Sequence, residues 1–297
     1  MNEPAKTLEG RVALVTGSGG GLGRTHALYL ASRGAAVVIN DIAQDAADRV
    51  AEEIRGQGGR ALAIAASVTD ENAVAALVAR TLAEFGRIDI VVNNAGILRD
   101  KSFAKMELAD FRLVVDVHLM GAVVVCKAVW DIMRAQNYGR IVMTTSSSGL
   151  YGNFGQANYG AAKMALVGLM QTLAIEGAKN DIRVNCLAPT AATGMTEGLL
   201  SQEDLKRLDP ALVSPGLLSL VGEDAPTRAI LCAGAGHFAA AHVTLTGGVH
   251  LGDRSDAGEQ LVMRWNTVTQ RDGEIIPAHG FVQSERELAA AGLGFDR

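Results

Sequence analysis

The feature that most constrains this chain is a short apolar run that leads through a glycine-rich turn into a helical pattern. Residues 11–16 read RVALVT, residues 17–23 read GSGGGLG, and the helical pattern continues to about residue 33. Glycines at such a junction let the backbone approach a phosphate group, and the N-terminus of the helix offers free N–H groups to it. A plain turn is the alternative for a glycine-rich loop taken alone. Between a strand and a helix, the loop predicts an α/β fold that binds a nucleotide.

Apolar strands and helical patterns alternate along most of the chain. We expect strands near residues 11–16, 35–40, 60–66, 88–93, 139–145, 182–188 and 242–246. We expect helices near residues 22–33, 43–57, 70–85, 107–136, 156–179 and 224–233. This alternation predicts a doubly wound, Rossmann-like parallel sheet with helices on both faces, and ligands that bind beyond the carboxyl ends of the strands.

The length of 297 residues is enough for one large domain. We expect a catalytic domain over residues 8–250, with a leucine-rich substrate loop at 190–222, and a C-terminal extension over residues 251–297. The loop is either a lid that excludes water from an apolar substrate or a pair of scaffold helices. The sequence leaves open whether the extension packs over the active site, lies at a subunit interface or is partly disordered.

The glycine turn and the end of the second expected strand indicate which cofactor binds. The turn has the spacing T-G-x-x-x-G-x-G, at Thr16, Gly17, Gly21 and Gly23, and not G-x-G-x-x-G. The strand ends in Asp41, whose carboxylate can accept hydrogen bonds from ribose hydroxyls and would repel a 2′-phosphate. No lysine or arginine stands at positions 18–20 or 42 to offset that repulsion. We therefore expect NAD and not NADP; a solvent-exposed aspartate at a strand end is the alternative.

Tyr159 and Lys163 stand four residues apart in an expected helix, and Ser146 precedes them in the same segment. Positions i and i+4 share one face of a helix, so the ammonium can lie near the phenol and lower its pKa. Such a tyrosine can remove a proton from a secondary alcohol while hydride leaves the same carbon. Ser146 can hold the alcohol oxygen by hydrogen bonding. Taken alone, Tyr159 and Lys163 are more simply explained as two neighbours on a helix surface. A cofactor site elsewhere in the chain favours the interpretation that they are catalytic.

The chain resembles the short-chain dehydrogenase/reductase family over about residues 8–250. The resemblance rests on four motifs in this order: Thr16-Gly17-x-x-x-Gly21-x-Gly23, Asn93-Asn94-Ala95-Gly96, Ser146 and Tyr159-x-x-x-Lys163. It implies that Tyr159 is the acid and base, that Lys163 also holds the nicotinamide ribose, and that Ser146 orients the substrate. It implies cofactor contacts at Gly17, Gly21, Leu22, Gly23, Asn94, Ala95 and Gly96.

Longer segments are similar to one branch of that family, the (3R)-hydroxyacyl-CoA dehydrogenase units of peroxisomal multifunctional enzymes type 2 and their stand-alone bacterial relatives. The segments are NNAGILRDKSFAKM, VHLMGA, YGRIVMTTSSSGLYGNFGQANYGAAK and LAIEGAKNDIRVN. This similarity implies NAD-dependent oxidation of a (3R)-3-hydroxyacyl-CoA to the 3-oxoacyl-CoA, with acyl and sterol-side-chain esters both open. The alternative is a dehydrogenase for a steroid or another apolar secondary alcohol without CoA. A non-catalytic nucleotide-binding regulator is a hypothesis of a different class.

Three positions depart from the common family pattern. His118 stands where an asparagine usually completes a proton relay, and the similar branch also has histidine there. Ser67 stands where an aspartate often contacts adenine, so we expect Ser67 or the backbone of Val68 to take that contact. The loop after the sixth strand lacks the usual Pro-Gly, and we expect Thr193 to contact the cofactor amide.

Composition argues against several classes of function. The chain has 27 basic and 32 acidic residues, a net charge of −5, and so no basic field for nucleic acid. We see no apolar run that approaches the ~18 residues of a membrane span, and no secretory-signal pattern in the first residues, so we expect a cytoplasmic protein. The 3 cysteines and 6 histidines lack the spacing of metal ligands, and we expect no metal site.

Two expected helices, at 107–136 and 156–179, hold more small apolar residues than one buried face needs. A second buried face predicts that these helices pair across a two-fold axis, and hence a homodimer or homotetramer. The sequence does not set the chain length of the substrate, the direction of the reaction or the pathway.

Overall fold

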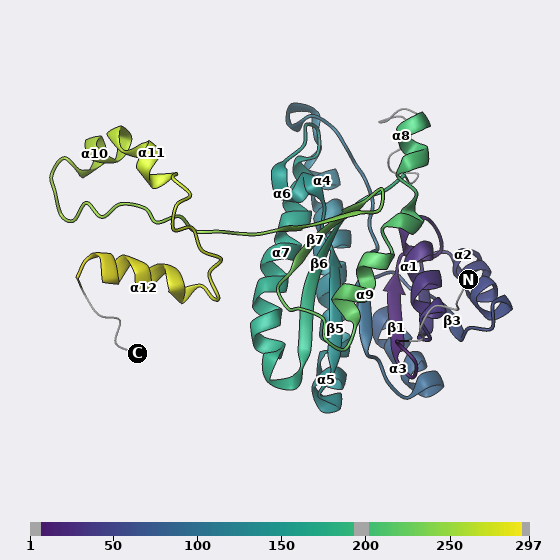
Figure 1. Cartoon of the computed structure of the whole chain (residues 1–297). Coiled ribbons are helices and arrows are strands. Elements are labelled where there is room, and N and C mark those ends of the chain that lie inside the picture. The colour runs from purple at the N-terminus through teal and green to yellow at the C-terminus, as the bar shows by residue number, and fades with distance from the viewer. Residues whose placement is uncertain (1–6, 193–201, 293–297) are drawn as a thin grey trace. The chain divides into compact units, whose positions relative to one another are not determined.

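The computed structural model describes residues 7–192 and 202–292 of the chain. Its eight-stranded sheet has the order β3-β2-β1-β4-β5-β6-β7-β8 (Figure 1). The strands are β1 Val12–Thr16, β2 Ala36–Asp41, β3 Ala61–Ala65, β4 Ile90–Asn93, β5 Gly139–Thr144, β6 Ile182–Thr190, β7 Ile230–Gly234 and β8 His237–Ala241. Every pairing from β3 to β7 is parallel. The expected doubly wound sheet is confirmed, and its strand order reverses between β1 and β4, where such sheets bind their ligands.

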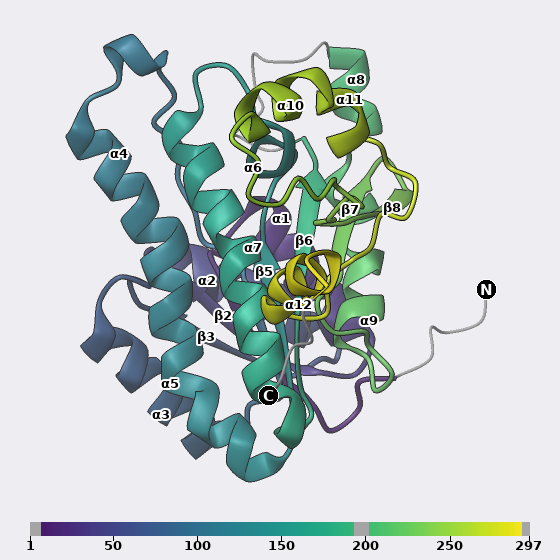
Figure 2. The same ribbon diagram turned by 90° about the vertical axis from the view of Figure 1, so that its left-hand side faces the viewer.

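Helices cover both faces of the sheet (Figures 1 and 2). They are α1 Gly21–Ser32, α2 Gln44–Gly56, α3 Glu71–Phe85, α4 Leu108–Val115, α5 Gly121–Gln136, α6 Ser147–Tyr151, α7 Ala157–Gly177, α8 Gln202–Arg207 and α9 Pro215–Val221. On one face α1 packs against α2 and α9; on the other, α3 packs against α5, and α4 lies along α7. Because both faces are covered, β1 has no exposed residue, which explains its uninterrupted apolar run.

The expectations for the last helix and the last strand of the sheet are wrong. Residues 230–234, expected to end a helix at 224–233, form β7, which pairs with β6 from Cys186 to Thr190. A two-residue turn at Ala235 and Gly236, both with positive φ, joins β7 to β8. Residues 242–246, expected as a strand, supply only an isolated bridge between Leu245 and Ile275. Alanine, leucine and cysteine have no strong strand preference, so the open edge of β6 decides the conformation of this segment.

The stretch 190–222, expected to be poor in helix, contains α8, a 3-10 turn at Pro210–Leu212 and α9. Leu217 and Leu220 of α9 are buried in the core against α1 and the sheet. The second half of the stretch is therefore scaffold. Residues 193–201, which carry the rest of the expected lid, lie outside the described residues.

The chain divides into two compact units, Met1–Ala240 and Ala241–Arg297. The boundary expected at residue 250 falls inside the second unit. That unit contains α10 Ala257–Met263, α11 Trp265–Val268 and α12 Phe281–Ala290. Within it, Thr246 Oγ1 donates to the carbonyl of Val268 at 2.7 Å, next to the bridge between Leu245 and Ile275.

One helical stretch of the described residues, Leu108–Gln136, has the length and composition of a membrane span, with a mean hydropathy of 1.8 in its most apolar window. Asp116, Lys127 and Asp131 interrupt this stretch, so it is not an unbroken apolar run in the sequence. The stretch comprises α4, a π-helical turn and α5, which pack on α7 and α3. Core helices of soluble proteins meet the same criteria, so the finding is weak evidence for a membrane, and the absence of one stays a prediction.

Candidate active site

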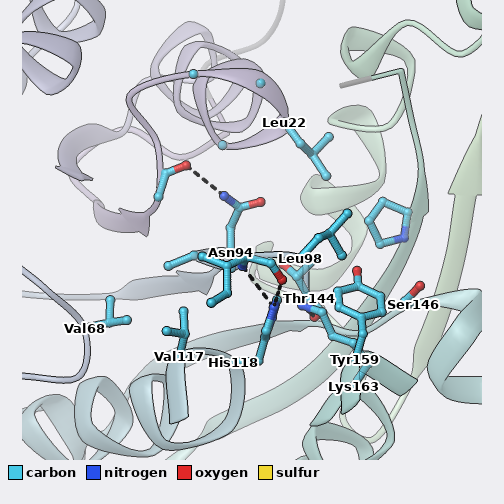
Figure 3. Close-up of a pocket in the computed structure, with 18 of the residues that line it drawn as sticks. Leu22, Val68, Asn94, Leu98, Val117, His118, Thr144, Ser146, Tyr159 and Lys163 are labelled. Atoms are coloured by element: carbon cyan, nitrogen blue, oxygen red, sulfur yellow. Dashed lines mark hydrogen bonds between the residues drawn. The ribbon is translucent and has the colours of Figure 1, made fainter. Parts of the chain in front are cut away.

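A cavity of about 880 Å³ lies at the carboxyl ends of β1, β2, β4, β5 and β6. All the predicted site residues except Thr193 line it: Gly17, Gly21, Leu22, Gly23, Asp41, Ser67, Val68, Asn94, Ala95, Gly96, His118, Ser146, Tyr159 and Lys163. Thr193 lies outside the described residues. Figure 3 shows Ser146, Tyr159 and Lys163 gathered on one side of this cavity, with His118 beside them. The structure thus brings together residues from segments far apart in the sequence, and their roles stay predictions.

The glycine turn is held in place by the NNAG segment. Asn94 Nδ2 donates to the carbonyls of Thr16 and Gly17, at 3.0 Å each, and Thr16 Oγ1 accepts from the N–H groups of Asn94 and Ala95. Gly17 has φ +60, and a Cβ there would lie 2.7 Å from Ala95 Cα. A Cβ on Gly23 would lie 2.3 Å from the Gly17 carbonyl oxygen. Only glycine fits at these two positions, because a side chain on Gly17 would collide with the backbone of Ala95 and one on Gly23 with the backbone of the turn itself.

The first turn of α1 fits the phosphates of a dinucleotide. The helix begins at Gly21, and its N-cap, Gly20, has no side chain to occupy the free N–H groups. Both glycines line the cavity. Free N–H groups and the positive end of the helix dipole both favour an anion there.

Asp41 is fixed at the rim of the same turn. Its Oδ2 accepts from the N–H of Gly19 at 3.0 Å, and its Oδ1 accepts from the N–H of Ala43 at 3.2 Å. A Cβ on Gly19 would lie 2.7 Å from Ala46 Cβ and 2.8 Å from Asp41 Oδ2, so a larger residue there would displace the carboxylate. A carboxylate held in this way can accept further hydrogen bonds from ribose hydroxyls.

The expected adenine side of the cavity has a small hydroxyl cluster. Ser67 Oγ lies 2.9 Å from Thr69 Oγ1, and both residues line the cavity next to Val68. Ser67 and Val68 were predicted from the sequence, whereas Thr69 was not. Its position two residues beyond Ser67, on the same turn, is the signal that could have found it.

Lys163 is buried at the back of the cavity, with 3% of its surface exposed. Its Nζ donates to the carbonyl oxygen of Thr144 at 2.6 Å and lies 5.5 Å from the centroid of the Tyr159 ring. Both side chains come from α7, one turn apart, as the spacing predicted. Thr144, the last residue of β5, is a partner that the sequence could not show, because it contributes a backbone oxygen.

The expected lowering of the Tyr159 pKa by Lys163 is wrong for this chain. Burial raises the pKa of Tyr159, a hydrogen bond with Ser146 lowers it, and the carboxylate of Asp100 raises it. Burial lowers the pKa of Lys163 to about 7. The helix spacing placed the two groups correctly, but the loss of water around each of them is the largest cause of its pKa shift.

His118 lies in a π-helical turn, Asp116–Met120, between α4 and α5. Its Nε2 lies 2.8 Å from the carbonyl oxygen and 3.1 Å from the amide nitrogen of Ile97, and its ring meets the Tyr159 ring edge-on, with centroids 5.2 Å apart. Burial and the nearby charge of Lys163 lower the pKa of His118 to about 3, although its backbone hydrogen bond raises it. A neutral ring therefore packs against the phenol.

Gly96 makes room for that ring. A Cβ at this position would lie 2.2 Å from His118 Cε1. The fourth residue of NNAG thus has a packing reason to be glycine that does not involve the cofactor.

Comparison with known proteins agrees with this geometry. The family model described as short chain dehydrogenase matches residues 11–204, more than half of the 297 residues. Peroxisomal multifunctional enzyme type 2 of Mus musculus is 52% identical over 224 residues, which are 72% of this chain and 30% of that protein. A putative short-chain type dehydrogenase/reductase of Mycobacterium tuberculosis is 45% identical over 276 residues, 90% of this chain and 96% of that protein.

Among solved structures, 7α-hydroxysteroid dehydrogenase complexed with NADH and 7-oxo glycochenodeoxycholic acid has a TM-score of 0.73 and 30% identity. The match covers 80% of this chain and 97% of the 7α-hydroxysteroid dehydrogenase chain. The present chain spans less than a third of the mouse enzyme. The mycobacterial match covers 90% of this chain, so it cannot end within the first 240 residues and must reach the second unit.

Gly96→Ala should lower kcat/KM for alcohol oxidation by roughly 100-fold. The added methyl group would displace the His118 ring, which would in turn shift the Tyr159 phenol away from the alcohol with which it reacts. The control is Gly56→Ala in α2, where nothing lies within 4 Å of the added Cβ. Steady-state kinetics on both variants would test this. Equal activity in the two variants would contradict the packing argument.

Two buried histidines should make the fold sensitive to acid. The pKa of His26 and that of His118 are each lowered by burial to about 3, so between about pH 6.5 and 3 the unfolded chain binds protons that the folded chain does not. The free energy of unfolding should therefore decrease as the pH is lowered through this window, by up to ~1.4 kcal/mol per pH unit for each histidine. Urea titrations at several pH values should give a smaller dependence for His118→Asn and an unchanged one for exposed His237→Asn. An unchanged dependence in His118→Asn would refute the argument.

Proposed function

Because the chain belongs to the short-chain dehydrogenase family and is an oxidoreductase acting on CH–OH groups, we propose that it oxidises (3R)-3-hydroxyacyl-CoA esters to 3-oxoacyl-CoA esters with NAD. The observation that carries the proposal is that Ser146 and Lys163, both buried, and Tyr159, half-buried, together line the cavity that the glycine turn borders. The segments similar to (3R)-hydroxyacyl-CoA dehydrogenases support the choice of substrate.

The residues that would hold NAD are those of the glycine turn, the end of β2 and the NNAG segment. Bound there, NAD would supply the carbon that accepts hydride. Asp41 favours NAD over NADP because its fixed carboxylate would repel a 2′-phosphate, and Ile42 beside it is exposed and uncharged. The NADH in the complex of 7α-hydroxysteroid dehydrogenase also supports this choice.

The chemistry falls to three side chains. Ser146 would donate a hydrogen bond to the reacting oxygen, and Tyr159 would take the hydroxyl proton in oxidation or return it in reduction. Lys163, between Thr144 and the phenol, would stabilise the negative charge that Tyr159 gains. In the reverse direction, the raised pKa of Tyr159 favours the protonated phenol that a 3-oxo group requires.

The cavity mouth supports a substrate with an anionic part. Arg99 lines the cavity, and Lys101 follows two residues later with its Nζ 3.2 Å from Asp110 Oδ2. Arg99 Nε also lies 3.9 Å from Asp110 Oδ1, but its side chain is 49% exposed, so the guanidinium can also meet a CoA phosphate. Leu98 and Leu113 in the same lining suit an apolar chain.

A steroid or another apolar secondary alcohol without CoA is the second candidate. The 7α-hydroxysteroid dehydrogenase neighbour favours it, since its complex contains a bile-acid derivative. Values of kcat/KM for a (3R)-3-hydroxyacyl-CoA and for a 7α-hydroxy bile acid should be compared. A higher value for the bile acid would reject the CoA ester in favour of the second candidate.

We also propose a cytoplasmic homodimer or homotetramer. Leu108 and Met120 on the α4–α5 stretch, and Met164 and Ile175 on α7, are exposed apolar side chains that a second copy could cover. Light scattering of the purified chain at micromolar concentration would test this, and a monomer would refute it.

Asp41→Ala should lower kcat/KM with NAD by roughly 10- to 100-fold, because the ribose hydroxyls would lose the charged carboxylate to which they donate. It should raise kcat/KM with NADP, because the carboxylate that repels the 2′-phosphate would be gone. Asp45→Ala, at an exposed carboxylate four residues away in α2, should leave both values nearly unchanged. Steady-state kinetics with the two cofactors would measure the ratio. An unaltered preference in Asp41→Ala would show that another group selects the cofactor.

Tyr159→Phe should reduce kcat by roughly 10²–10⁴-fold, because it removes the proton donor and acceptor while keeping the ring. NAD should still raise the melting temperature of the variant, since the glycine turn is untouched. Full activity in Tyr159→Phe would refute the assigned acid and base. A wild-type chain that binds NAD but oxidises none of the alcohols tried would favour the non-catalytic regulator.

A further inference from the structure

The segment that follows β3 forms one wall of the cavity, beside the end of β2. The N–H of Ala66 donates to the carbonyl of Asp41 at 3.0 Å, and Asn40 Nδ2 donates to the carbonyl of Ala66 at 3.0 Å. On its other side the segment is packed against α5, because Val68 is buried and a Cβ on Gly121 would lie 2.6 Å from Val68 Cγ2. The protein itself therefore fixes the position of this wall.

The wall lies on the opposite side of the cavity from the proposed chemistry. Figure 3 shows Val68 on one side and Ser146 and Tyr159 on the other. In a dinucleotide the phosphates join the nicotinamide half to the adenosine half. With phosphates at the first turn of α1 and nicotinamide beside Tyr159, the adenosine half would extend toward Asp41, whose carboxylate suits its ribose. The purine would then lie beyond the ribose, at the segment after β3, which is the strand paired with β2.

This wall offers a purine apolar surface and hydroxyl groups. Ile42, which is 79% exposed, and Val68 supply the apolar surface. Among the described residues that line the cavity, Asp41 is the one carboxylate, and each of its oxygens already accepts a backbone N–H. The groups that remain for the polar edge of the purine are the hydroxyls of Ser67 and Thr69.

The two hydroxyls form a pair whose hydrogen bond can run in either direction. Ser67 Oγ lies 2.9 Å from Thr69 Oγ1, and either oxygen can be the donor. Ser67 Oγ also accepts from the N–H of Thr69 at 3.4 Å, which leaves it a second lone pair. When Ser67 donates to Thr69, a Thr69 proton and a Ser67 lone pair are free for a ligand. When Thr69 donates, Ser67 supplies the free proton and Thr69 the free lone pair.

Adenine and hypoxanthine present opposite patterns at their polar edges. Adenine has a 6-amino donor next to the acceptor N1, whereas hypoxanthine has a 6-oxo acceptor next to the donor N1–H. A carboxylate only accepts hydrogen bonds, so it favours the 6-amino group and repels the 6-oxo group. A hydroxyl pair that reverses its internal bond can match both patterns.

We propose that Ser67 and Thr69 form a purine site that accepts 6-amino and 6-oxo purines almost equally. The chain then binds NAD and nicotinamide hypoxanthine dinucleotide with similar affinity. This inference rests on the proposed function for its dinucleotide. It adds that the cofactor is selected at the ribose, by Asp41, and not at the base.

The test is isothermal titration calorimetry of the full chain with each of the two dinucleotides, which needs no alcohol substrate. The two Kd values of the wild-type chain should agree within about 3-fold, because each purine keeps its hydrogen bonds. Ser67→Asp should bind nicotinamide hypoxanthine dinucleotide roughly 10-fold more weakly than NAD, because a fixed acceptor would face the 6-oxo group. Ser67→Ala should weaken both dinucleotides by a similar factor. Ser32→Asp, at the exposed last residue of α1, adds the same charge away from the cavity and should keep the wild-type ratio.

A wild-type chain that binds NAD more than about 10-fold tighter than the hypoxanthine dinucleotide would overturn the inference and leave the proposed function intact. An unaltered ratio in Ser67→Asp would also overturn it, since the purine would then lie away from Ser67. Similar binding of both dinucleotides by a chain that oxidises no 3-hydroxyacyl-CoA would support the inference and refute the proposed function. Binding of neither dinucleotide would refute both.

Discussion

The burial of the Lys163 side chain is the constraint on which the rest of the site depends. An ammonium that is 3% exposed is costly unless it has a partner, and the carbonyl oxygen of Thr144 supplies one at 2.6 Å. This bond attaches α7 to the end of β5, so that Tyr159 and Ser146 lie on the same side of the cavity. The same burial lowers the pKa of Lys163 to about 7, so the side chain loses its charge near neutral pH.

The site is assembled at strand ends by contacts between backbone and small side chains. Asn94 holds the turn after β1, and Gly96 leaves space for His118, which packs against Tyr159. Each contact constrains the next, so the position of the phenol depends on residues that never touch a substrate. The tyrosine and lysine suit many secondary alcohols. Selection among them falls to the rest of the cavity lining, which includes Leu98, Arg99 and Leu113.

Local sequence signals predicted much of this arrangement and missed what distant segments decide. The glycine turn, Asp41 and the i, i+4 spacing of Tyr159 and Lys163 are short-range patterns, and the structure places all of these residues in one cavity. The strand β7 was mistaken for helix, because its alanines and leucines suit both and only pairing with β6 selects the strand. The pKa of Tyr159 was expected to fall, but burial by the whole fold raises it. Packing of His118 on Gly96 joins residues far apart in the chain, and no local pattern shows it.

Hydride transfer from the R enantiomer of a 3-hydroxyacyl-CoA to NAD is the reaction that we propose for this chain. The most direct measurement is the absorbance of NADH formed by the purified chain with matched (3R) and (3S) esters. We expect NADH to form rapidly from the (3R) ester and slowly from the (3S) ester, and we expect far less reduced cofactor when NADP replaces NAD. No NADH from either ester, or equal rates with both, would contradict it.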